Sequence, residues 1–596
     1  MKNIKDVKQL KLFDPWNHIS PQKKKILDLS WPGLFQKIIL PVLPALKFGS
    51  FYSDSRGRKS KELYAMLGAL VLQQQFDLTD ADAVDQYIFD ERWHYALDRH
   101  EKSDNTEYMC LKTFWSVRDI ATKNDFDVEI FESVAGKLAE VFNVDTGTQR
   151  LDSVHIKSNM RKMARVTICS KSIRNFLQNL KRHNKELLSV IAKELIDKYL
   201  PKKAFQCFAM VKPSEAKKTL AEVAKDLYTL IKQFENIHFV SSMRTYKHLE
   251  RILKEQFIVK ESDGKEIIEA KKPKDVASDS LQNPSDPDAT YSGHKGQGYQ
   301  VQLMETVCKD KDKKSETLNL ITHVEVEQAH KSDAHALIPA VESTEKRGLK
   351  PKELTADEGY SSDENCECAK EHGVEVVTPV KGASKGGKLS DFSMNSKGKV
   401  KLCPEGKKPV KVKRNKRFSA AFDSDVCGNC PNLSKCPVEK GKKYFYLRYT
   451  EKDLRIALRR QYEKTDEFKD RYRWRSGVEA AFSELNRKTG IKKLRVRGFR
   501  AVRFAAILKA AGLNIFRAAA VRRKAGKRAA AAAAAGNASL NQLFSFILSV
   551  KEQVKPIFYR FTEKFGLYFR RNEAWPVIQA DSRFCFFTLL SLLMAS

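Results

Sequence analysis

Three acidic residues stand in settings where carboxylates can hold divalent metal ions. Asp152 lies in a short β-type segment, Asp357 ends another, and Glu479 lies in a helical stretch. Cleavage of a phosphodiester requires that negative charge be neutralised on both the attacking and the leaving oxygen. Two metal ions about 3.5–4 Å apart can do this. Mg²⁺ prefers carboxylates and water, so such sites place a few acids at strand ends and on a facing helix. The three acids therefore fit a site for Mg²⁺ or Mn²⁺.

Each of the two strand acids also has an ordinary explanation. An acid inside a buried strand is costly unless it is paired or metal-bound, but Asp152 could instead lie on an exposed strand edge. Asp357 precedes Gly359, which permits a sharp turn, and the carboxyl ends of strands in open α/β sheets are where ligands bind. Asp357 could also simply cap a helix. Glu358 should point away from the site, because successive strand residues alternate faces.

Glu479 follows a tyrosine and an arginine at helical spacing. At about 100° per residue, Tyr472, Arg475 and Glu479 fall on one side of a helix. Arg475 and Glu479 are four residues apart, so an ordinary surface ion pair is the alternative. A neighbouring apolar stripe predicts that the helix packs on a sheet; it comprises Trp474, Val478, Phe482 and Leu485. The tyrosine in line with the pair favours a functional role.

The chain after Glu479 is strongly basic. Between Ala481 and Arg528 it has fifteen Lys or Arg residues and one acid, Glu484. The densest part comprises Lys492, Lys493, Arg495, Arg497 and Arg500. Gly498 permits a loop to approach a phosphate backbone closely, which predicts DNA contact. A solvated basic face is the alternative.

The composition of the whole chain also points to nucleic acid. The 596 residues include 108 Lys and Arg against 74 Asp and Glu, a formal charge of +34. The commonest partner of a large basic protein is nucleic acid, through neutralisation of phosphates; a ribosome-associated or merely basic protein is the alternative. Neither a secretory signal nor an apolar run of about 20 residues is visible, so we expect no membrane partner.

Four cysteines gather in one stretch and form a second candidate metal site. A Cys-x2-Cys pair with two further cysteines beside Pro and Gly fits a four-thiolate zinc site in a reducing cytosol. Its members are Cys403, Cys427, Cys430 and Cys436. The spacing is irregular, with x5 where a second x2 is usual. The alternative is four reduced cysteines in a loop-rich insertion.

Several elements must position these residues. Periodicity predicts helices over 30–145, with Ser60 as a candidate cap, and an α/β region after them. In that region strands are expected at 151–156, 299–307 and 318–326, then a helix at 334–346, a strand ending at Asp357, a helix at 362–372 and a strand at 374–380. Three consecutive strands followed by alternating helices and strands is the order of an RNase H-like mixed sheet.

The other segments are predicted as additions to this core. They are a helical insertion at 172–258, a polar loop at 260–297, a Cys-rich insertion at 385–445 with a strand at 443–449, and helices across 451–525. We therefore predict three regions. They are a helical DNA-binding or dimerisation domain at 1–145, an RNase H-like catalytic domain at 146–525, and a poly-Ala linker with an unassigned tail at 526–596.

Several motifs, in this order, resemble the DDE transposases of bacterial insertion sequences, in the group with a Tyr-x2-Arg-x3-Glu signature. Tyr472, Arg475 and Glu479 match that signature as spaced. The segment Asp357-Glu-Gly-Tyr360 resembles the family's second-acid motif, and Leu151-Asp-Ser-Val-His resembles its first-acid strand. Further similar segments are Asp286-Pro-Asp-Ala, 294–302, 497–500 and 511–517. The resemblance covers residues 30–525.

The resemblance implies an enzyme that cuts DNA at the ends of a mobile element and joins those ends to target DNA. Asp152, Asp357 and Glu479 would hold the metal ions, and metal-activated water would attack first, followed by the freed 3′-hydroxyl. Tyr472 and Arg475 would position DNA phosphates. The resemblance also implies a homodimer on double-stranded DNA, in the bacterial cytoplasm at the nucleoid.

The chain departs from the family pattern at two places. The signature often continues with Lys seven positions after the Glu, where this chain has Asn486, so Arg487 and Lys488 are the candidates for that phosphate contact. The tail after Ala529 matches nothing in the family. Two alternatives stay open: a transposase-derived DNA-binding protein that no longer cuts, and an RNase H-like nuclease that does not join strands.

Overall fold

A computed structural model describes residues 1–6, 13–101, 103–201, 212, 214–262, 265–310, 312–313, 316–382 and 388–528. The chain divides into two compact units, Met1–Lys524 and Ala525–Ser596. All elements below belong to the first unit, apart from the last four residues of the final helix. The seven-alanine run and the tail, predicted as a linker and an unassigned segment, lie outside the described residues.

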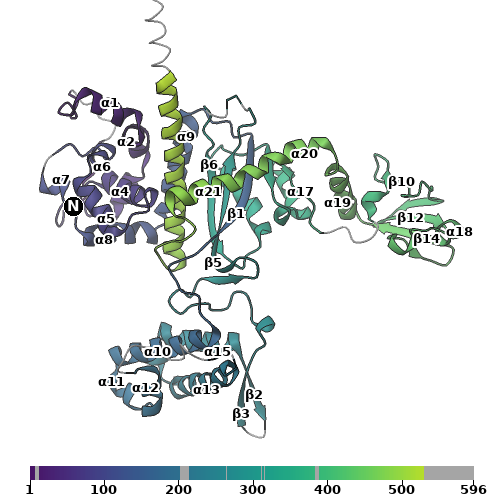
Figure 1. Ribbon diagram of the computed structural model, residues 1–596, viewed down its shortest axis with the longest axis horizontal. Helices are drawn as coiled ribbons and strands as arrows, with labels where there is room; N and C mark the ends of the chain where they lie inside the picture. Colours follow the sequence, from purple (N-terminus) through teal and green to yellow (C-terminus); the bar gives the residue numbers. More distant parts are fainter. Residues whose placement is uncertain are drawn as a thin grey trace, which may run out of the picture. The chain divides into compact units, whose positions relative to one another are not determined.

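A curled mixed sheet forms the centre of the first unit (Figure 1). Its strands are β1 (Thr148–Ile156), β4 (Thr290–Ser292), β5 (Gly296–Thr306), β6 (Ile321–Gln328), β7 (Glu353–Ala356) and β8 (Glu375–Val377). The order is β4-β5-β1-β7-β8, and β6 pairs with β5. β1 is antiparallel to β5 and parallel to β7, which in turn is parallel to β8. The predicted mixed α/β fold is confirmed, and it is consistent with an RNase H-like core.

Helices cover both faces of this sheet. On one face, Leu151 of β1 packs in a buried cluster with α16 (Leu337–Glu345) and α17 (Asp363–Glu371). On the other face, Val154 and Ile156 share a large core with the N-terminal helices and the C-terminal helices. Because strand side chains alternate between faces, Asp152 lies on the same face as Val154. That face is the one covered by the C-terminal helices.

The N-terminal region is helical, as predicted. Its helices are α1 (Pro21–Leu29), α2 (Trp31–Leu34), α3 (Ala45–Phe48), α4 (Leu63–Gln75), α5 (Asp80–Phe89), α6 (Glu91–Ala96), α7 (Asp104–Glu107), α8 (Leu111–Lys123) and α9 (Phe126–Val141). The expectation that Ser60 caps the helix after it is wrong. Glu62 accepts the N–H groups of Tyr64 and Ala65 instead, and Ser60 accepts the N–H of Asn3. The chain stays extended for two more residues before it turns into α4.

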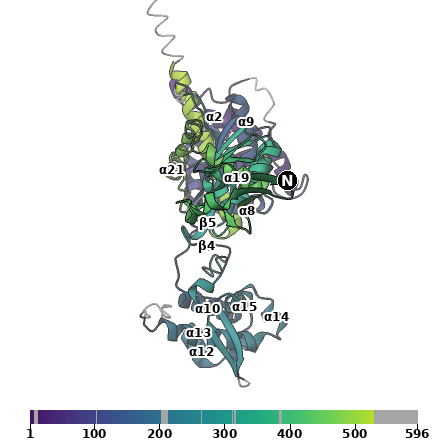
Figure 2. The same cartoon turned by 90° about the vertical axis from the view of Figure 1, so that its right-hand side faces the viewer.

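A helical group follows β1 and has a hydrophobic core of its own, beyond the end of β5 (Figures 1 and 2). It comprises α10 (Arg165–His183), α11 (Lys185–Ser189), α12 (Lys193–Tyr199), α13 (Ala216–Phe234), α14 (His238–Ser241) and α15 (Arg244–Gln256). It begins at Arg165, seven residues before the expected 172. The expected loop at 260–297 is wrong where β2 (Phe257–Ser262) pairs with β3 (Lys265–Ala270) and where β4 forms. The β-branched side chains of 258–259 and 267–268 favour that hairpin.

A second, smaller sheet occupies the region predicted to be rich in cysteine. Its strands are β11 (Lys411–Arg414), β12 (Phe418–Asp423), β13 (Glu439–Lys440) and β14 (Tyr444–Tyr449), next to a two-stranded pair of β9 (Ser393–Met394) and β10 (Val400–Leu402). β14 agrees with the strand expected at 443–449. Phe418 and Tyr449 stack with ring centroids 4.9 Å apart inside a separate core that this sheet shares with the β9–β10 pair and Leu454 of the helix that follows.

The C-terminal region is helical, as predicted for 451–525, but a 3-10 turn interrupts the single helix expected to carry Tyr472, Arg475 and Glu479. It consists of α19 (Glu451–Tyr462), α20 (Asp466–Tyr472), a 3-10 turn (Arg473–Ser476), α21 (Gly477–Thr489) and a final helix, Phe499–Arg528. Gly490 ends α21 with a φ of 65°, a conformation that glycine adopts without strain.

The final helix is long and apolar enough to cross a bilayer by length and composition, and so is the bent pair 31–51. However, 78% of the most apolar window of Phe499–Arg528 is buried inside the protein. The core helix of a globular protein has the same character. Its apolar side chains are accounted for by packing against the sheet and the N-terminal helices.

Candidate active site

Asp152 and Asp357 lie next to each other on adjacent parallel strands. The register of β1 and β7 runs from Thr148 opposite Glu353 to Leu151 opposite Ala356. The next residue along each strand is one of the two acids. Two positions far apart in the sequence are thus brought to one place by strand pairing.

Arg475 connects the two carboxylates. Its Nη2 lies 2.7 Å from Oδ2 of Asp152 and 3.5 Å from Oδ2 of Asp357, so the two oxygens cannot be farther apart than these distances together. The Asp152 side chain is 14% exposed and that of Asp357 is 45% exposed. Burial raises the pKa of Asp152, Asp357 raises it further, and the Arg475 guanidinium and the Ser153 N–H oppose this rise. Asp152 is therefore the more enclosed of the two acids.

Arg150, two residues before Asp152 on the same face of β1, holds the 3-10 turn that carries Arg475. Its Nη1 donates to the Trp474 carbonyl at 2.9 Å. A Cβ on Gly477 would overlap the Arg150 guanidinium, so glycine is needed for this close approach. The strand and the turn are locked together within a few residues of the acid pair.

A buried ionic network extends from this contact. Arg150 pairs with Glu305, which is fully buried, at 2.5 Å, and Glu305 pairs with Arg517 of the final helix at 2.8 Å. Arg517 also binds Glu484 of α21 at 2.9 Å. The network therefore fixes β1, β5, α21 and the final helix to one another. Nothing in the sequence pattern pointed to it, since its members are far apart in the chain.

Glu479 is not brought together with the other two acids. It is an exposed residue in the first turn of α21, and within the described parts of the chain it forms no metal-holding group of three with Asp152 and Asp357. The predicted single helix is wrong here, because Tyr472 ends α20 and Arg475 lies in the 3-10 turn. Tyr472 stacks on Phe468 with centroids 5.3 Å apart. Still, α21 packs against β1 through Val478, Phe482 and Leu485, as the apolar stripe predicted.

A second polar layer, which sequence reasoning missed, lies beside the acid pair. Tyr360 is fully buried and donates to Oε1 of Gln302 at 2.5 Å. Gln302 in turn donates to Asp333 at 3.0 Å and to Glu327 at 3.2 Å. Burial raises the pKa of Tyr360, and the nearby Asp333 and Asp152 raise it further. The tyrosine of the Asp-x-Gly-Tyr motif was the available signal for this layer.

The basic loop after α21 runs beside the strand that carries Asp152. Lys157 N–H donates to the Lys492 carbonyl at 2.9 Å, and Leu494 N–H donates to the Lys157 carbonyl at 2.8 Å. At the far end of the loop, Asp286 and Asp288 accept the N–H groups of Gly498 and Phe499. The Asp-Pro-Asp motif thus caps the final helix and fixes the loop.

The basic residues differ in how far acids already neutralise them. Lys488 pairs with Glu484 at 3.0 Å, Arg495 pairs with Asp77 at 3.2 Å, and Arg497 donates to the carbonyl of Asn159. In contrast, Arg487, Lys492, Lys493 and Arg500 are exposed, and no ion pair is recorded for them within the described ranges. The latter four are the better candidates for phosphate contact.

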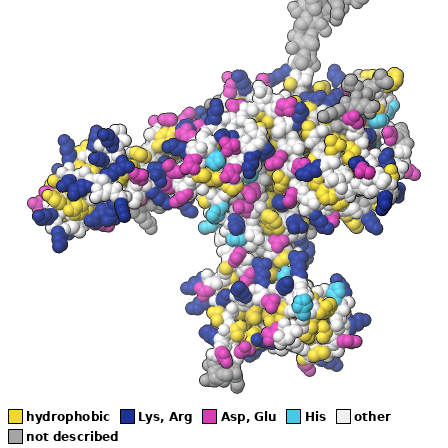
Figure 3. All heavy atoms as spheres, turned by 180° about the vertical axis from the view of Figure 1, so that it is seen from behind, with side chains coloured by type: hydrophobic (Ala, Val, Ile, Leu, Met, Phe, Trp, Pro, Cys, Tyr) yellow, Lys and Arg dark blue, Asp and Glu magenta, His cyan; other side chains and the backbone are white. Residues whose placement is uncertain are grey.

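Further cations join this loop from segments that the sequence did not single out. Lys157, Arg161 and Lys162 are exposed in the connection between β1 and α10. Burial lowers the pKa of Lys171 on α10, and the like charges of Arg497 and Arg161 lower it further. Lys171 therefore lies close enough to Arg161 and Arg497 for the three cations to form one positively charged region. Elsewhere, Lys and Arg are spread over the visible face of the molecule (Figure 3).

The four predicted zinc ligands gather at the smaller sheet. Burial raises the pKa of Cys427, and the thiols of Cys436, Cys403 and Cys430 raise it further, which places all four near one another. Lys407 N–H donates to Sγ of Cys403 at 3.3 Å. Cys430 N–H donates to the Cys427 carbonyl at 3.2 Å, forming a tight turn between the two. Sulfur ligands of this number suit zinc.

Neither candidate metal site is complete as the side chains stand. Among the described residues, no group of three or more His, Cys, Asp or Glu side chains is arranged to hold a metal ion. Asp152 and Asp357 nevertheless fit a divalent cation chemically, because two carboxylates converge on one cationic group, and Mg²⁺ takes one or two carboxylates plus water. The third acid would have to approach from α21.

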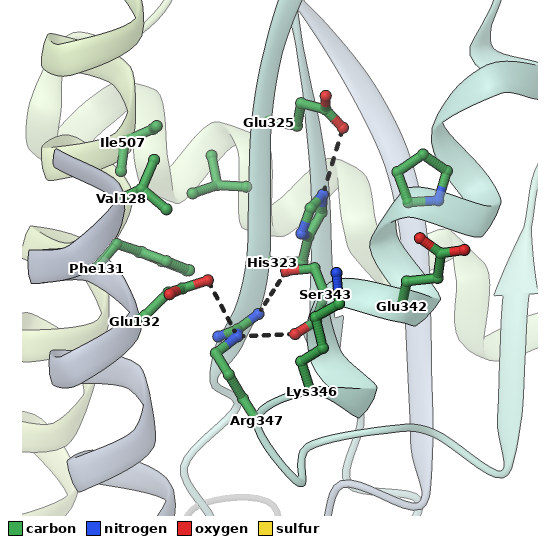
Figure 4. A pocket seen from close by; sticks show the side chains of 12 residues that line it. Val128, Phe131, Glu132, His323, Glu325, Glu342, Ser343, Lys346, Arg347 and Ile507 are labelled. Atoms are coloured by element: carbon green, nitrogen blue, oxygen red, sulfur yellow. Dashed lines mark hydrogen bonds and ion pairs between the residues drawn. The ribbon is translucent and has the colours of Figure 1, made fainter. Parts of the chain in front are cut away.

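One cavity among the described residues lies away from the acid pair. It has a volume of about 300 Å³ and is lined by α9, β6, α16 and the final helix, with none of the predicted site residues among its walls (Figure 4). Arg347 crosses it, with Nε 3.5 Å from Glu132 and Nη2 donating to Oγ of Ser343 at 3.1 Å. Beside it, His323 lies 3.8 Å from Glu325 on the same strand, and Nη2 of Arg347 donates to the Thr322 carbonyl of that strand at 2.7 Å. These contacts connect α9 to the sheet and its covering helix.

The geometry defines a class of protein first: a mixed α/β protein with paired acids on adjacent parallel strands and a basic loop beside them. Comparison with known families then agrees. Residues 33–117 match a transposase domain, and residues 402–519 match the transposase DDE domain. The two matches support a DDE transposase of an insertion-sequence type, and the DDE domain implies a nuclease or transposase enzyme that uses divalent metal and binds DNA. No curated protein matches the chain significantly.

Proposed function

We propose that this chain cuts DNA at the ends of a mobile element and joins those ends to target DNA. The observation that carries the proposal is the convergence of Asp152 and Asp357 on one cationic group, at adjacent positions of two parallel strands. Asp152 and Asp357 lie outside both matched stretches, and Glu479 lies inside the DDE-domain match. The acid pair is therefore independent support for the same activity.

In this mechanism the chain's residues hold, orient and shield the reacting groups. Asp152 and Asp357 would bind a divalent cation, and Glu479 would complete the site by turning its exposed side chain toward them from the first turn of α21. The cation, when bound, neutralises the charge that develops on the attacking and leaving oxygens. Arg150 and the Glu305 network keep β1 and α21 in place, so that little reorganisation is needed during reaction.

DNA would pass beside β1, over the basic loop. Lys492, Lys493 and Arg500 are exposed and carry charge that no recorded ion pair offsets in the described ranges. Lys157 and Arg161 extend the same surface toward α10. Because phosphate contacts position DNA without reading its sequence, this surface would hold element-end and target DNA alike. A homodimer would bring the two ends of an element together.

The cysteine region would bind one structural Zn²⁺. The four thiols supply a soft donor set, and the Lys407 N–H at Sγ of Cys403 is the kind of contact that stabilises a thiolate ligand. The region has its own small core, so a metal there would stabilise a local fold and would not take part in the reaction at the acid pair.

The proposal is tested by incubating the full chain with Mg²⁺ and a plasmid that carries the genomic DNA from both sides of its gene. We expect cut ends and joined products from the wild type and neither from Asp152→Asn or Asp357→Asn. Glu358→Gln is the matched control, since this neighbouring acid is exposed, and it should keep activity. Wild-type cleavage in Asp357→Asn would contradict the proposal. Binding without any cutting would indicate a regulator, and cutting without joining would indicate a nuclease.

A further inference from the structure

The Arg475 side chain lies between two carboxylates and neutralises part of their negative charge. The carboxylates of Asp152 and Asp357 come from adjacent strands, and the Arg475 guanidinium is the cationic group in contact with both. Only 22% of the Arg475 side chain is exposed, and its Nε is buried with no hydrogen-bond partner in the structure. A buried N–H group without an acceptor costs free energy, so this position of the Arg475 side chain is less stable than one in which all of its donors are paired.

The arginine and a divalent cation would serve the same electrostatic purpose. Two carboxylates this close repel each other unless a cation lies between them. Arg475 brings one positive charge and a divalent ion brings two, so the ion neutralises the pair more fully. Both cannot contact Oδ2 of Asp152 and Oδ2 of Asp357 at the same time without crowding.

The Arg475 side chain can move away from the two carboxylates without a change in the fold. It lies in a 3-10 turn between two helices, and its neighbours Arg473 and Ser476 are exposed. The turn is anchored through the Trp474 carbonyl by Arg150, so the side chain can change direction while the backbone stays in place. Guanidinium groups bind phosphate as readily as carboxylate, with the same planar geometry.

We propose that Arg475 and the divalent cation compete for the Asp152–Asp357 pair, so that metal loading releases Arg475 to a DNA phosphate. This inference rests on the proposed function. In the absence of metal, the Arg475 guanidinium is paired with the two carboxylates and is not available to a phosphate. With metal bound, the same guanidinium becomes available to DNA. Metal and DNA then each strengthen the binding of the other, because such coupling is reciprocal.

The first test measures metal binding without DNA or cleavage. Mn²⁺ is titrated into the full chain and followed by its paramagnetic resonance signal, for the wild type, Arg475→Gln and Arg475→Lys. Removing the competing charge should tighten Mn²⁺ binding by about 5-fold or more in Arg475→Gln, the low end of typical coupling. Arg475→Lys, which keeps the charge as a flexible point, should lie between the two. Arg473→Gln, in the same turn but paired with Asp470, should match the wild type.

The second test measures the coupling itself. Affinity for fluorescent duplex DNA is compared in Ca²⁺ and in EDTA. The wild type should bind more tightly in Ca²⁺, and the ratio of the two affinities should fall about 5-fold or more in Arg475→Gln, the low end of typical allosteric coupling. Unchanged Mn²⁺ affinity in Arg475→Gln, or an unchanged ratio, overturns the inference. If Arg475→Gln does not fold, as judged by its thermal transition, the same two measurements on Arg475→Lys decide. Failure of the proposed function appears separately, as persistent cleavage by Asp357→Asn.

Discussion

The acid pair and the cysteine cluster are two candidate metal sites built in opposite ways. Asp152 and Arg475 are 323 residues apart in the chain and meet only through the sheet and the C-terminal helices. The four cysteines lie within residues 403–436, around one small sheet with its own core. The first site depends on the whole fold of the first unit, whereas the second depends on a local one. Damage to distant residues should therefore affect the first site more than the second.

The same contrast appears in how the sites are fixed. Buried ion pairs that span β1, β5, α21 and the final helix surround the acid pair. Around the cysteines the ion pairs are exposed, such as Arg448 with Glu439 at 2.5 Å and side-chain exposures of 36% and 69%. Buried pairs are costly to break, and exposed pairs contribute little.

The largest expected effect concerns the third acid. If the Glu479 side chain reaches the acid pair during reaction, Glu479→Gln should lower the cleavage rate by about 10³-fold, because a metal ligand contributes several kcal/mol to the transition state. Cleavage of end-labelled DNA measures it. Glu467→Gln, an exposed acid on α20, serves as the control. A cleavage rate of Glu479→Gln within a few-fold of wild type would show that Asp152 and Asp357 suffice for metal binding. The active site would then not include α21.

The next effect concerns zinc. We expect one zinc per chain by elemental analysis and none after Cys427→Ser together with Cys430→Ser, because thiolates are the ligands that such a site requires. Mn²⁺ binding at the acid pair should be unchanged in that variant if the two sites are independent. Absence of zinc from the wild-type protein would show that the cysteine region is an insertion without a metal site. Loss of Mn²⁺ binding would show that the two regions fold as one.

A stability comparison sharpens the contrast between buried and exposed pairs. Glu305→Ala should lower the free energy of unfolding by about 3–5 kcal/mol, because it leaves Arg150 and Arg517 buried without their partner. Glu439→Ala, which breaks the exposed pair of the smaller sheet, should cost less than about 1 kcal/mol. Denaturant titration measures both. Equal costs would mean that the Glu305 network does not hold the core together.

The smallest effect concerns the DNA-facing charge. Each phosphate contact adds about 0.9 to the slope of log affinity against log salt on duplex DNA. Lys492→Ala with Lys493→Ala should therefore flatten that slope by about 2 units, on specific and random DNA alike. Arg495→Ala should have a smaller effect, since Asp77 already pairs with it. Lys442→Ala with Lys443→Ala, at the smaller sheet, is the control. A larger effect of the control would move the DNA path to the cysteine region.

Much of the fold could be predicted where signals are local. The apolar stripe on α21 correctly indicated a helix packed on the sheet, and the β-type segments at 151–156, 299–307 and 318–326 correspond to β1, β5 and β6. The hairpin of β2 and β3 was missed because its charged residues outweighed a short β-branched pattern. The break at Arg473–Ser476 was missed because a single 3-10 turn between two α-helices is too short to leave a periodicity of its own in the sequence.

By itself, the sequence determined which residues could do the chemistry: the acids and the Tyr-x2-Arg-x3-Glu spacing identified Asp152, Asp357 and Glu479, and the charge identified a polyanionic partner. Only the tertiary structure decided which of these residues meet. Strand register placed Asp152 beside Asp357, Arg517 joined Glu305 of β5 to Glu484 of α21, and Arg475 turned toward the two aspartates. The physical reason is that a four-residue spacing specifies neighbours only within an unbroken helix. Contacts between distant segments depend instead on packing and on the pairing of buried charge, which no local pattern records.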